Sequence, residues 1–368
     1  MLSFTAMVVE RGSRLLVIRL SSLGDVARLL PCLNSLKASG YLGRLDLAVE
    51  DRFAPLLELF PVVDRVAAYP RRNGELGYKP LAWARAMGSY LADLRAARYD
   101  WSVDLHGILR SALVGQVSGA ARTAGYARGF GKEGSHLLYE VPLICGASPR
   151  ISRYARYAGA IAALGLPGPA GGYLSPRVGE GDRAEVERFL KGRGLEPRSF
   201  LFAFIGTSRA QAYKRWPLER FLELASLVWE GMRLPTVLGW GPDEAQEVAA
   251  LPSRGHLHVI PDWPLPQLLE CSRSAAAFVG ADTGAMHLAA LMGVPTVALL
   301  GPTDPVLNEP WGRRAKVVYR SGIQRPCSGP GCDHRSCMGA IGAQEVFDRL
   351  KEALAPEGQS VADSGHGP

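Results

Sequence analysis

The stretch "AAAFVGADTGAMHLAALMGVPTVALLG" (275–301) contains the pattern that decides the fold. Two short apolar runs, 275–282 and 294–301, are typical of buried strands. The segment between them, "GAMHLAALMG", has the length and composition of a short helix. A strand, a helix and a second buried strand in succession are typical of a parallel sheet covered by helices.

The same alternation occurs in the first half of the chain. We expect a buried strand at 14–20, a helix from about Asp25 to Lys37 and a second strand at 45–50. A long amphipathic segment at 81–99 predicts a further helix. The first half is therefore expected to be a parallel sheet with helices on both faces.

A break near 164–182 separates this half from a second one. Glycine and proline are dense there, and apolar periodicity is lost, which is typical of a linker. The alternation then restarts with a strand at 199–206 and a helix at 217–231 that opens with proline. We predict two Rossmann-like, doubly wound α/β domains, 1–172 and 173–342, that face each other across a cleft.

Composition agrees with a globular protein of two domains. The chain has 368 residues, of which 47% are hydrophobic and 21% are charged. Its net charge of +7 favours anionic partners without naming them. The first residues do not resemble a signal peptide, and no apolar run reaches the roughly 18 residues that span a bilayer. We expect a cytoplasmic protein with only peripheral contact to the inner face of the inner membrane, and a disordered tail at 356–368.

The strongest chemical signal follows the strand that ends near Gly280. Asp282, Thr283 and Gly284 form the turn, and His287 lies in the first turn of the next helix. Free amides and the helix dipole at such a start favour an anion such as a diphosphate. The alternative is that Asp282 or Thr283 only caps the helix.

A second signal combines hydroxyl and cationic side chains between a strand and a helix. Thr207 and Ser208 follow the strand at 199–206, and Lys214 lies in the loop before the helix at 217–231. These groups favour a phosphate, and a solvated basic loop is the alternative. After a later strand, Asp243 is placed either to bind ribose hydroxyls or to cap a helix.

In the first half, Asp25 follows the first strand in a setting rich in basic residues. We predict a carboxylate base within a cationic surface, although Asp25 taken by itself is more readily explained as a helix N-cap. The neighbouring candidates are Arg19, Ser22, His106, Arg110, Arg128 and Lys132.

Three of the six cysteines are clustered with spacing C-x4-C-x4-C, namely Cys327, Cys332 and Cys337. The cluster lacks the tight C-x2-C pair and a clear fourth ligand of a structural zinc site. We predict that no metal is bound, with zinc at these cysteines as the alternative.

Several motifs together resemble the lipopolysaccharide heptosyltransferases of glycosyltransferase family 9, most of all those of type I. The resemblance runs along nearly the whole chain and rests on "SSLGDV", "FPVVDRV", "RYDWSVDLHGILRSAL", "GTSRAQAYKRWP", "GADTGAMHLAALMGVPTVALLGPTDP" and "PWG". The sequence departs from that family at Ala285, Met286 and His106, where Leu, Ser and Gln are common.

The resemblance implies a GT-B fold, with an acceptor domain followed by a nucleotide-sugar domain. A final helix, 343–355, would pack back on the first domain. The implied reaction moves L-glycero-D-manno-heptose from ADP-heptose to a Kdo residue of the lipopolysaccharide inner core, with inversion. No cofactor is obligatory, because the ADP-sugar is itself the donor substrate.

The resemblance also implies a role for each candidate residue. Asp25 would be the general base, and the basic residues around it would meet the anionic Kdo–lipid A acceptor. The remaining candidates would hold the donor's nucleotide, phosphates or sugar, namely Thr207, Ser208, Lys214, Asp243, Asp282, Thr283, Gly284 and His287. The alternatives are a family member with another nucleotide-activated sugar or acceptor, and a nucleotide-sugar-binding protein without catalysis. Only the net charge suggests a nucleic-acid-binding role, and we expect no nucleic-acid partner, because the sequence lacks the interleaved aromatic and basic residues that such modules need.

Overall fold

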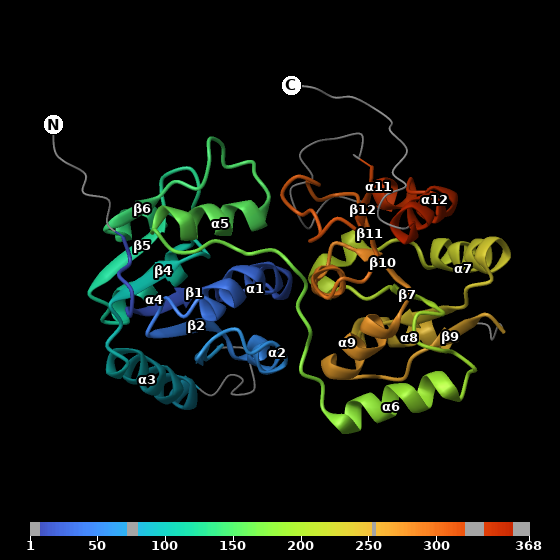
Figure 1. The fold of residues 1–368 in the computed structure, drawn as a ribbon, viewed down its shortest axis with the longest axis horizontal. Coiled ribbons are helices and arrows are strands. Elements are labelled where there is room, and N and C mark those ends of the chain that lie inside the picture. Colours follow the sequence, from blue (N-terminus) through green and yellow to red (C-terminus); the bar gives the residue numbers. More distant parts are fainter. Residues whose placement is uncertain (1–7, 72–79, 252–254, 321–334, 356–368) are drawn as a thin grey trace. The chain divides into compact units, whose positions relative to one another are not determined.

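Two six-stranded parallel sheets form the frame of the computed structural model, which describes residues 8–71, 80–251, 255–320 and 335–355. Each sheet belongs to one of two compact units (Figure 1). Unit 1 comprises Met1–Arg177 together with Val306–Asn308, and unit 2 comprises Val178–Pro305 together with Glu309–Pro368. The boundary after Arg177 falls inside the glycine- and proline-rich stretch that we expected to be the linker.

The described elements alternate between strands and helices, with η marking short 3-10 helices. Those of unit 1 are β1 (Arg14–Ile18), α1 (Leu23–Ala38), β2 (Arg44–Glu50), η1 (Asp51–Phe53), α2 (Ala54–Leu59), β3 (Arg65–Tyr69), α3 (Pro80–Ala96), β4 (Trp101–Asp104), α4 (Leu109–Val117), β5 (Arg122–Tyr126), η2 (Ser135–Leu138), β6 (Val141–Leu143) and α5 (Arg153–Ala163). Those of unit 2 are α6 (Glu180–Lys191), β7 (Leu201–Phe204), η3 (Arg209–Lys214), α7 (Leu218–Met232), β8 (Thr236–Gly239), η4 (Pro242–Glu244), α8 (Ala245–Ala249), β9 (Leu257–Val259), α9 (Leu265–Ser274), β10 (Ala277–Ala281), α10 (Gly284–Leu291), β11 (Thr296–Leu300), β12 (Ala315–Tyr319), α11 (Arg335–Gly339) and α12 (Ala343–Leu354).

The two sheets have the same topology. The strand order is β3-β2-β1-β4-β5-β6 in unit 1 and, read from its other edge, β9-β8-β7-β10-β11-β12 in unit 2. Both orders reverse between the first and fourth strands of the unit, which is the doubly wound arrangement that we predicted. Ligands of such sheets bind outside the carboxyl ends of the strands at this reversal. The expected sites therefore follow β1 and β4 in unit 1, and β7 and β10 in unit 2.

Alternate residues of the central strands build separate cores on the two faces of the unit 2 sheet. Leu201 and Ala203 of β7 belong to the core that α7 and α12 cover. Phe200 and Phe202 lie in the other core, with residues of α6, α9 and α10. This period of two is what a strand buried on both faces requires.

The final helix, α12, packs in unit 2 against α7, β11 and β12. Its apolar stripe, which includes Val346, Phe347 and Leu350, is part of a unit 2 core. The apolar stripe of α12 is therefore buried within unit 2. Our expectation that 343–355 packs on the N-terminal domain stays a prediction.

The predicted disordered tail, 356–368, lies outside the described residues. Within the described ranges, we find no helix with both the length and the apolar character that crossing a bilayer demands.

Candidate functional site

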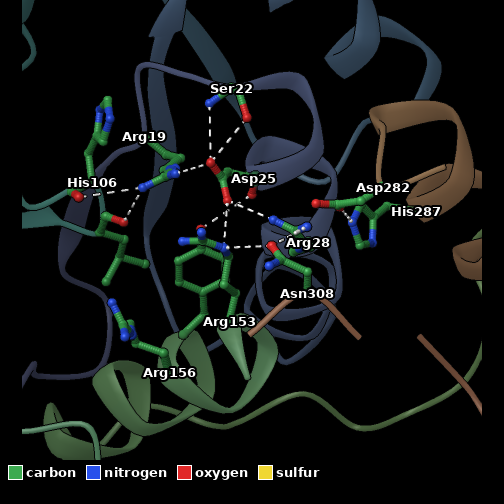
Figure 2. Close-up of polar contacts among 12 residues, drawn as sticks. Arg19, Ser22, Asp25, Arg28, His106, Arg153, Arg156, Asp282, His287 and Asn308 are labelled. Carbon is green, nitrogen blue, oxygen red and sulfur yellow. Dashed lines mark hydrogen bonds and ion pairs between the residues drawn. The ribbon is translucent and has the colours of Figure 1, made fainter. Parts of the chain in front are cut away.

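Asp25 lies in the first turn of α1, directly after β1 (Figure 2). Its Oδ2 accepts hydrogen bonds from the backbone N and the Oγ of Ser22, at 3.5 and 3.1 Å. A carboxylate is favoured in the first turn because the helix dipole is positive there. Ser22, not Asp25, is the N-cap residue of α1, so the N-cap alternative is wrong for Asp25, which supports the helix start from the third helical position.

Three arginines surround the Asp25 carboxylate, namely Arg19 from the loop after β1, Arg28 from α1 and Arg153 from α5 (Figure 2). Arg28 Nη1 donates to Oδ1 at 2.9 Å, and Arg153 Nε lies 3.3 Å from the same oxygen. Arg19 forms an ion pair with Oδ2. Asn308 lies beside them, because its Oδ1 accepts from Arg28 Nη2 at 3.1 Å and from Arg153 Nε at 3.5 Å. We call Asp25, Arg19, Arg28, Arg153 and Asn308 the arginine cluster.

The arginine cluster keeps Asp25 ionised. Burial would raise the pKa of this carboxyl, but the charges of Arg19, Arg153 and Arg28 outweigh burial and hold the pKa well below its usual range. Asp25 is therefore a carboxylate at any physiological pH, and in this state it binds a proton only weakly.

The turn after β4 brings His106 toward the same site. Arg19 Nη1 donates to the backbone oxygens of Leu105 and His106 at 3.1 and 3.5 Å. Burial and the charge of Arg19 lower the pKa of His106 to about 3, so its imidazole is neutral at pH 7. Asp104 shapes this turn, because its Oδ1 accepts from the backbone N of His106 and of Gly107 at 2.7 and 3.1 Å.

The other basic candidates of unit 1 lie outside the arginine cluster. Arg110 pairs with Glu50 at 3.1 Å, and its guanidinium lies over the ring of Tyr69. Arg128 and Lys132 are exposed in the turn after β5. That turn reaches the β4 end of the sheet, because the backbone N of Lys132 donates to Gly107 O at 2.7 Å.

In unit 2, the strand reversal holds a buried group of three side chains. Lys214 Nζ lies 3.0 Å from Asp282 Oδ2 and 3.3 Å from the Asp282 backbone oxygen. His287 Nε2 lies 3.1 Å from the other carboxylate oxygen, Oδ1. All three residues are buried. The structure thus brings Lys214 together with Asp282, which lies 68 residues further along the chain, and with the nearby His287.

The start of α10 is free of a side-chain cap. Thr283 is the N-cap residue, but its side chain makes no capping hydrogen bond, so the capping alternative is wrong for Thr283. The hydroxyls of Thr283 and of Thr303, which follows β11, are buried and find no hydrogen-bond partner within the described residues. Gly284 is the first residue of the helix. Open amides, a positive dipole and two unsatisfied hydroxyls form a site suited to an anion.

Thr207 belongs to a neighbouring polar network around Glu244. Its backbone N donates to Glu244 Oε1 at 3.2 Å, and its hydroxyl accepts from Arg215 Nε at 2.9 Å. Arg215 also forms an ion pair with Glu244, whose pKa is raised by burial. Asp243 is instead bound by Arg209, with Arg209 Nε at 2.9 Å. Ser208 is exposed at the start of η3 and joins none of these contacts.

The cysteine cluster is only partly described. Cys327 and Cys332 lie outside the described residues, and Cys337 is buried in a unit 2 core. Where the structure does describe side chains, no group of three His, Cys, Asp or Glu residues is arranged to hold a metal.

Sequence reasoning missed Arg28, Arg153 and Asn308 of the arginine cluster, and Glu244 of unit 2. Arg28 follows Asp25 by three residues, a spacing that places two side chains together on a helix, and this signal was available. Arg153 and Asn308 have no local signal, because only the fold brings them to Asp25.

Comparison with known proteins gives four findings. The sequence profile of glycosyltransferase family 9 (heptosyltransferase) matches residues 87–336. Lipopolysaccharide heptosyltransferase 1 of Pseudomonas aeruginosa is 28% identical over 380 aligned positions, which cover 94% of this chain and 99% of that protein. The Escherichia coli heptosyltransferase WaaC, solved with ADP, superposes with a TM-score of 0.71 at 22% identity, over 92% of this chain and 99% of that one. The same protein solved with ADP-2-deoxy-2-fluoro heptose gives 0.69 at 23% identity, over 92% and 99% of the two chains.

Proposed function

The chain belongs to glycosyltransferase family 9, and it is a glycosyltransferase of the GT-B fold. From this premise we propose that it transfers L-glycero-D-manno-heptose from ADP-heptose to a Kdo residue of the lipopolysaccharide inner core, with inversion. The observation that carries the proposal is the polar group at each strand reversal: the Asp25 carboxylate in unit 1, and Lys214, Asp282 and His287 in unit 2.

In this proposal Asp25 is the general base of a single displacement. An acceptor hydroxyl gives its proton to an Asp25 oxygen while the hydroxyl oxygen attacks the anomeric carbon of the donor. The bond from that carbon to the diphosphate breaks, and ADP leaves with the electron pair. Inversion needs only one such step and therefore one base. The ionised state of Asp25 supports this role.

The donor would bind at the strand reversal of unit 2. The amides that begin α10, with the Thr283 and Thr303 hydroxyls, offer donors to a diphosphate. Lys214 would offset the charge that develops on ADP, with Asp282 and His287 holding the lysine or the sugar. WaaC has been solved with ADP and with a fluorinated ADP-heptose, which supports an ADP-sugar as donor here.

The ribose contact is less direct than we first expected. Asp243 is held by Arg209, and the adjacent Glu244 is buried with its oxygens bound to backbone amides. Asp243, whose side chain is 29% exposed, is the better placed of the two acids to accept from ribose hydroxyls. Thr207 would contribute through its backbone, and Ser208 through its exposed hydroxyl.

The acceptor would meet the basic side of unit 1, with Arg19, Ser22 and His106 nearest the base. Because the proposed acceptor is a lipid, an anionic membrane surface is part of the proposal. Leu109 and Leu113 of α4 and Leu137 of η2, which contacts α4, are exposed by 44, 48 and 78%. Arg128 and Lys132 are exposed in the turn that precedes η2. Apolar side chains beside cations suit a bilayer with anionic headgroups.

The direct test incubates the purified chain with ADP-heptose and a Kdo–lipid A acceptor, and mass spectrometry follows the product. The expected result is a gain of one heptose. Parallel reactions with other ADP- and UDP-sugars, and with an acceptor that already carries one heptose, test the alternative substrates. Binding of ADP-heptose without any product on either acceptor would indicate a nucleotide-sugar-binding protein instead.

The base assignment predicts the behaviour of Asp25→Asn. The amide keeps the hydrogen bonds to Ser22 but cannot take a proton, so we expect kcat to fall by about 10²- to 10⁴-fold. The affinity for ADP-heptose, measured by calorimetry, should stay near that of the wild type, because Asp25 lies in unit 1. Asp51→Asn, the same change at η1, serves as control and should leave turnover intact. Near-normal turnover of Asp25→Asn would remove it as the base.

A further inference from the structure

The arginine cluster poses a chemical problem for a base. A carboxylate whose pKa is pressed below its usual range by cations gains little by taking a proton, so it accelerates proton removal weakly. The neighbouring arginines thus lower the basicity of the proposed base. Departure of one of these cations when the acceptor binds would make Asp25 a stronger base.

The three arginines are held to different degrees. The side chains of Arg19 and Arg28 are 7 and 5% exposed, and each is also tied to other groups, the carbonyls of Leu105 and His106 for Arg19 and Asn308 for Arg28. Arg153 is 32% exposed, and its Nε, which lies 3.3 Å from Asp25 Oδ1, makes only a longer contact of 3.5 Å to Asn308 Oδ1. Arg153 is therefore the one of the three that can move at the lowest cost.

The cluster also has capacity for a second anion. Asp25 is the only carboxylate that pairs with Arg19 or with Arg153 within the part of the chain that the structure describes. The Nε of Arg19 is buried and lacks a hydrogen-bond partner there. Cations in excess of carboxylates are costly to bury unless an anion joins them. A planar carboxylate is the group that guanidiniums bind best, through paired hydrogen bonds.

We propose that the carboxylate of an acidic acceptor sugar draws Arg153 away from Asp25 and so releases Oδ1 to take the proton of the acceptor hydroxyl. Arg153 is then a specificity-determining residue, which couples the acidity of the acceptor to the activity of the base. In a sugar acid the carboxylate and the hydroxyl belong to one ring, so both reach this small site together. The inference rests on the proposed function and adds to it the reason why a sugar acid is accepted.

The other described groups near Asp25 do not serve, as Arg153 does, as a cation that can leave Asp25 for the acceptor carboxylate. His106 is neutral, and Tyr157 donates only to the Asp25 backbone oxygen, at 3.5 Å. Arg156, one turn further along α5, donates to the carbonyl of Phe130 and does not reach Asp25 (Figure 2). Arg156 is therefore a matched control.

The test compares a Kdo–lipid A acceptor with its counterpart in which the Kdo carboxylate is reduced to an alcohol. For the wild type, we expect kcat to be at least about tenfold lower on the reduced acceptor, because one cation near a carboxylate shifts its pKa by a unit or more. Arg153→Gln removes the restraint permanently. It should turn over the reduced acceptor at least as fast as the wild type does, while its KM for the acidic acceptor rises. Arg156→Gln should keep the wild-type preference.

Several results would overturn the inference. One is an equal kcat of the wild type on both acceptors, and another is an equal loss on both in Arg153→Gln. A third is a similar drop in the kcat of the wild type on an acceptor that keeps the Kdo carboxylate but lacks the lipid phosphates. A phosphate would then be the controlling anion. An active Asp25→Asn variant is a separate outcome, which refutes the base assignment itself.

Discussion

The surroundings of His106, in the turn after β4, shift the pKa of its imidazole strongly. Its pKa near 3 lies far below the value of about 6.5 expected in an unfolded chain. Between these two values the unfolded state binds a proton that the folded state does not. The free energy of unfolding therefore rises with pH through this window, and it falls as the pH drops below about 6.5.

This gives a prediction for stability. Between pH 7 and pH 5, His106 should cost the wild type about 1–2 kcal/mol of unfolding free energy. His106→Gln cannot titrate, so its unfolding free energy from urea titrations should depend less on pH by that amount. His136→Gln, a substitution in η2, is the control. An unchanged pH dependence in His106→Gln would contradict the assignment.

The site residues differ in how far sequence could predict them. Asp25, Lys214, Asp282 and His287 could be predicted because each follows a strand, where an open parallel sheet binds its ligands. The partners that set the chemistry of Asp25 could not, because Arg153 comes from a helix in another part of the chain and Asn308 from a loop beyond β11. The charged residues in a sequence show that cations are present, but they do not show which carboxylate each cation contacts in the fold.

At the level of elements, α4 and η2 together present exposed apolar side chains. Leu109, Leu113 and Leu137 are exposed, whereas Ser111, Ala112 and Val114 of α4 are buried. The proposed contact with a membrane would account for these leucines.

We therefore expect the double variant Leu113→Asp/Leu137→Asp to lose binding to vesicles that contain anionic lipid, measured by flotation. Repulsion from anionic headgroups adds to the lost apolar contact, so binding should fall by about tenfold or more. Leu81→Asp, at an exposed leucine of α3, keeps this surface and should bind as the wild type does. Equal binding of the double variant would refute the surface.

The elements also show where prediction ends. The strands and helices follow from periodicity, and the predicted helix near Asp25 begins only slightly earlier, at Leu23, because Ser22 is its N-cap. The amphipathic pattern of α12 predicts that one face of this helix is buried, but not which residues of the fold cover that face.

At the level of the molecule, two units of the same topology carry different chemistry. The unit 1 reversal is lined by arginines and an ionised carboxylate, whereas that of unit 2 offers open helix amides with a buried lysine. Doubly wound order alone could be predicted from the βα alternation. The difference in side-chain chemistry between the two units depends on the few residues that follow β1, β4, β7 and β10.

The proposed binding of ADP to unit 2 predicts a pattern of hydrogen exchange. ADP should slow exchange of the backbone amides near 206–215 and 282–290, because its phosphates would bind at the start of α10 and near η3. The amides of 19–28 should be unaffected. In Lys214→Met the protection should weaken at the same ADP concentration. Strong protection at 19–28 instead would move the nucleotide to unit 1.

One short segment has consequences for engineering. Val306–Asn308 clusters with unit 1, although the chain on both sides of it belongs to unit 2. A recombinant fragment that stops after Arg177 would lack the amide that orients Arg28 and Arg153. Hybrid enzymes assembled from halves of two relatives would likewise need to take this tripeptide from the parent that supplies the N-terminal half, or their acceptor preference would be inherited incompletely.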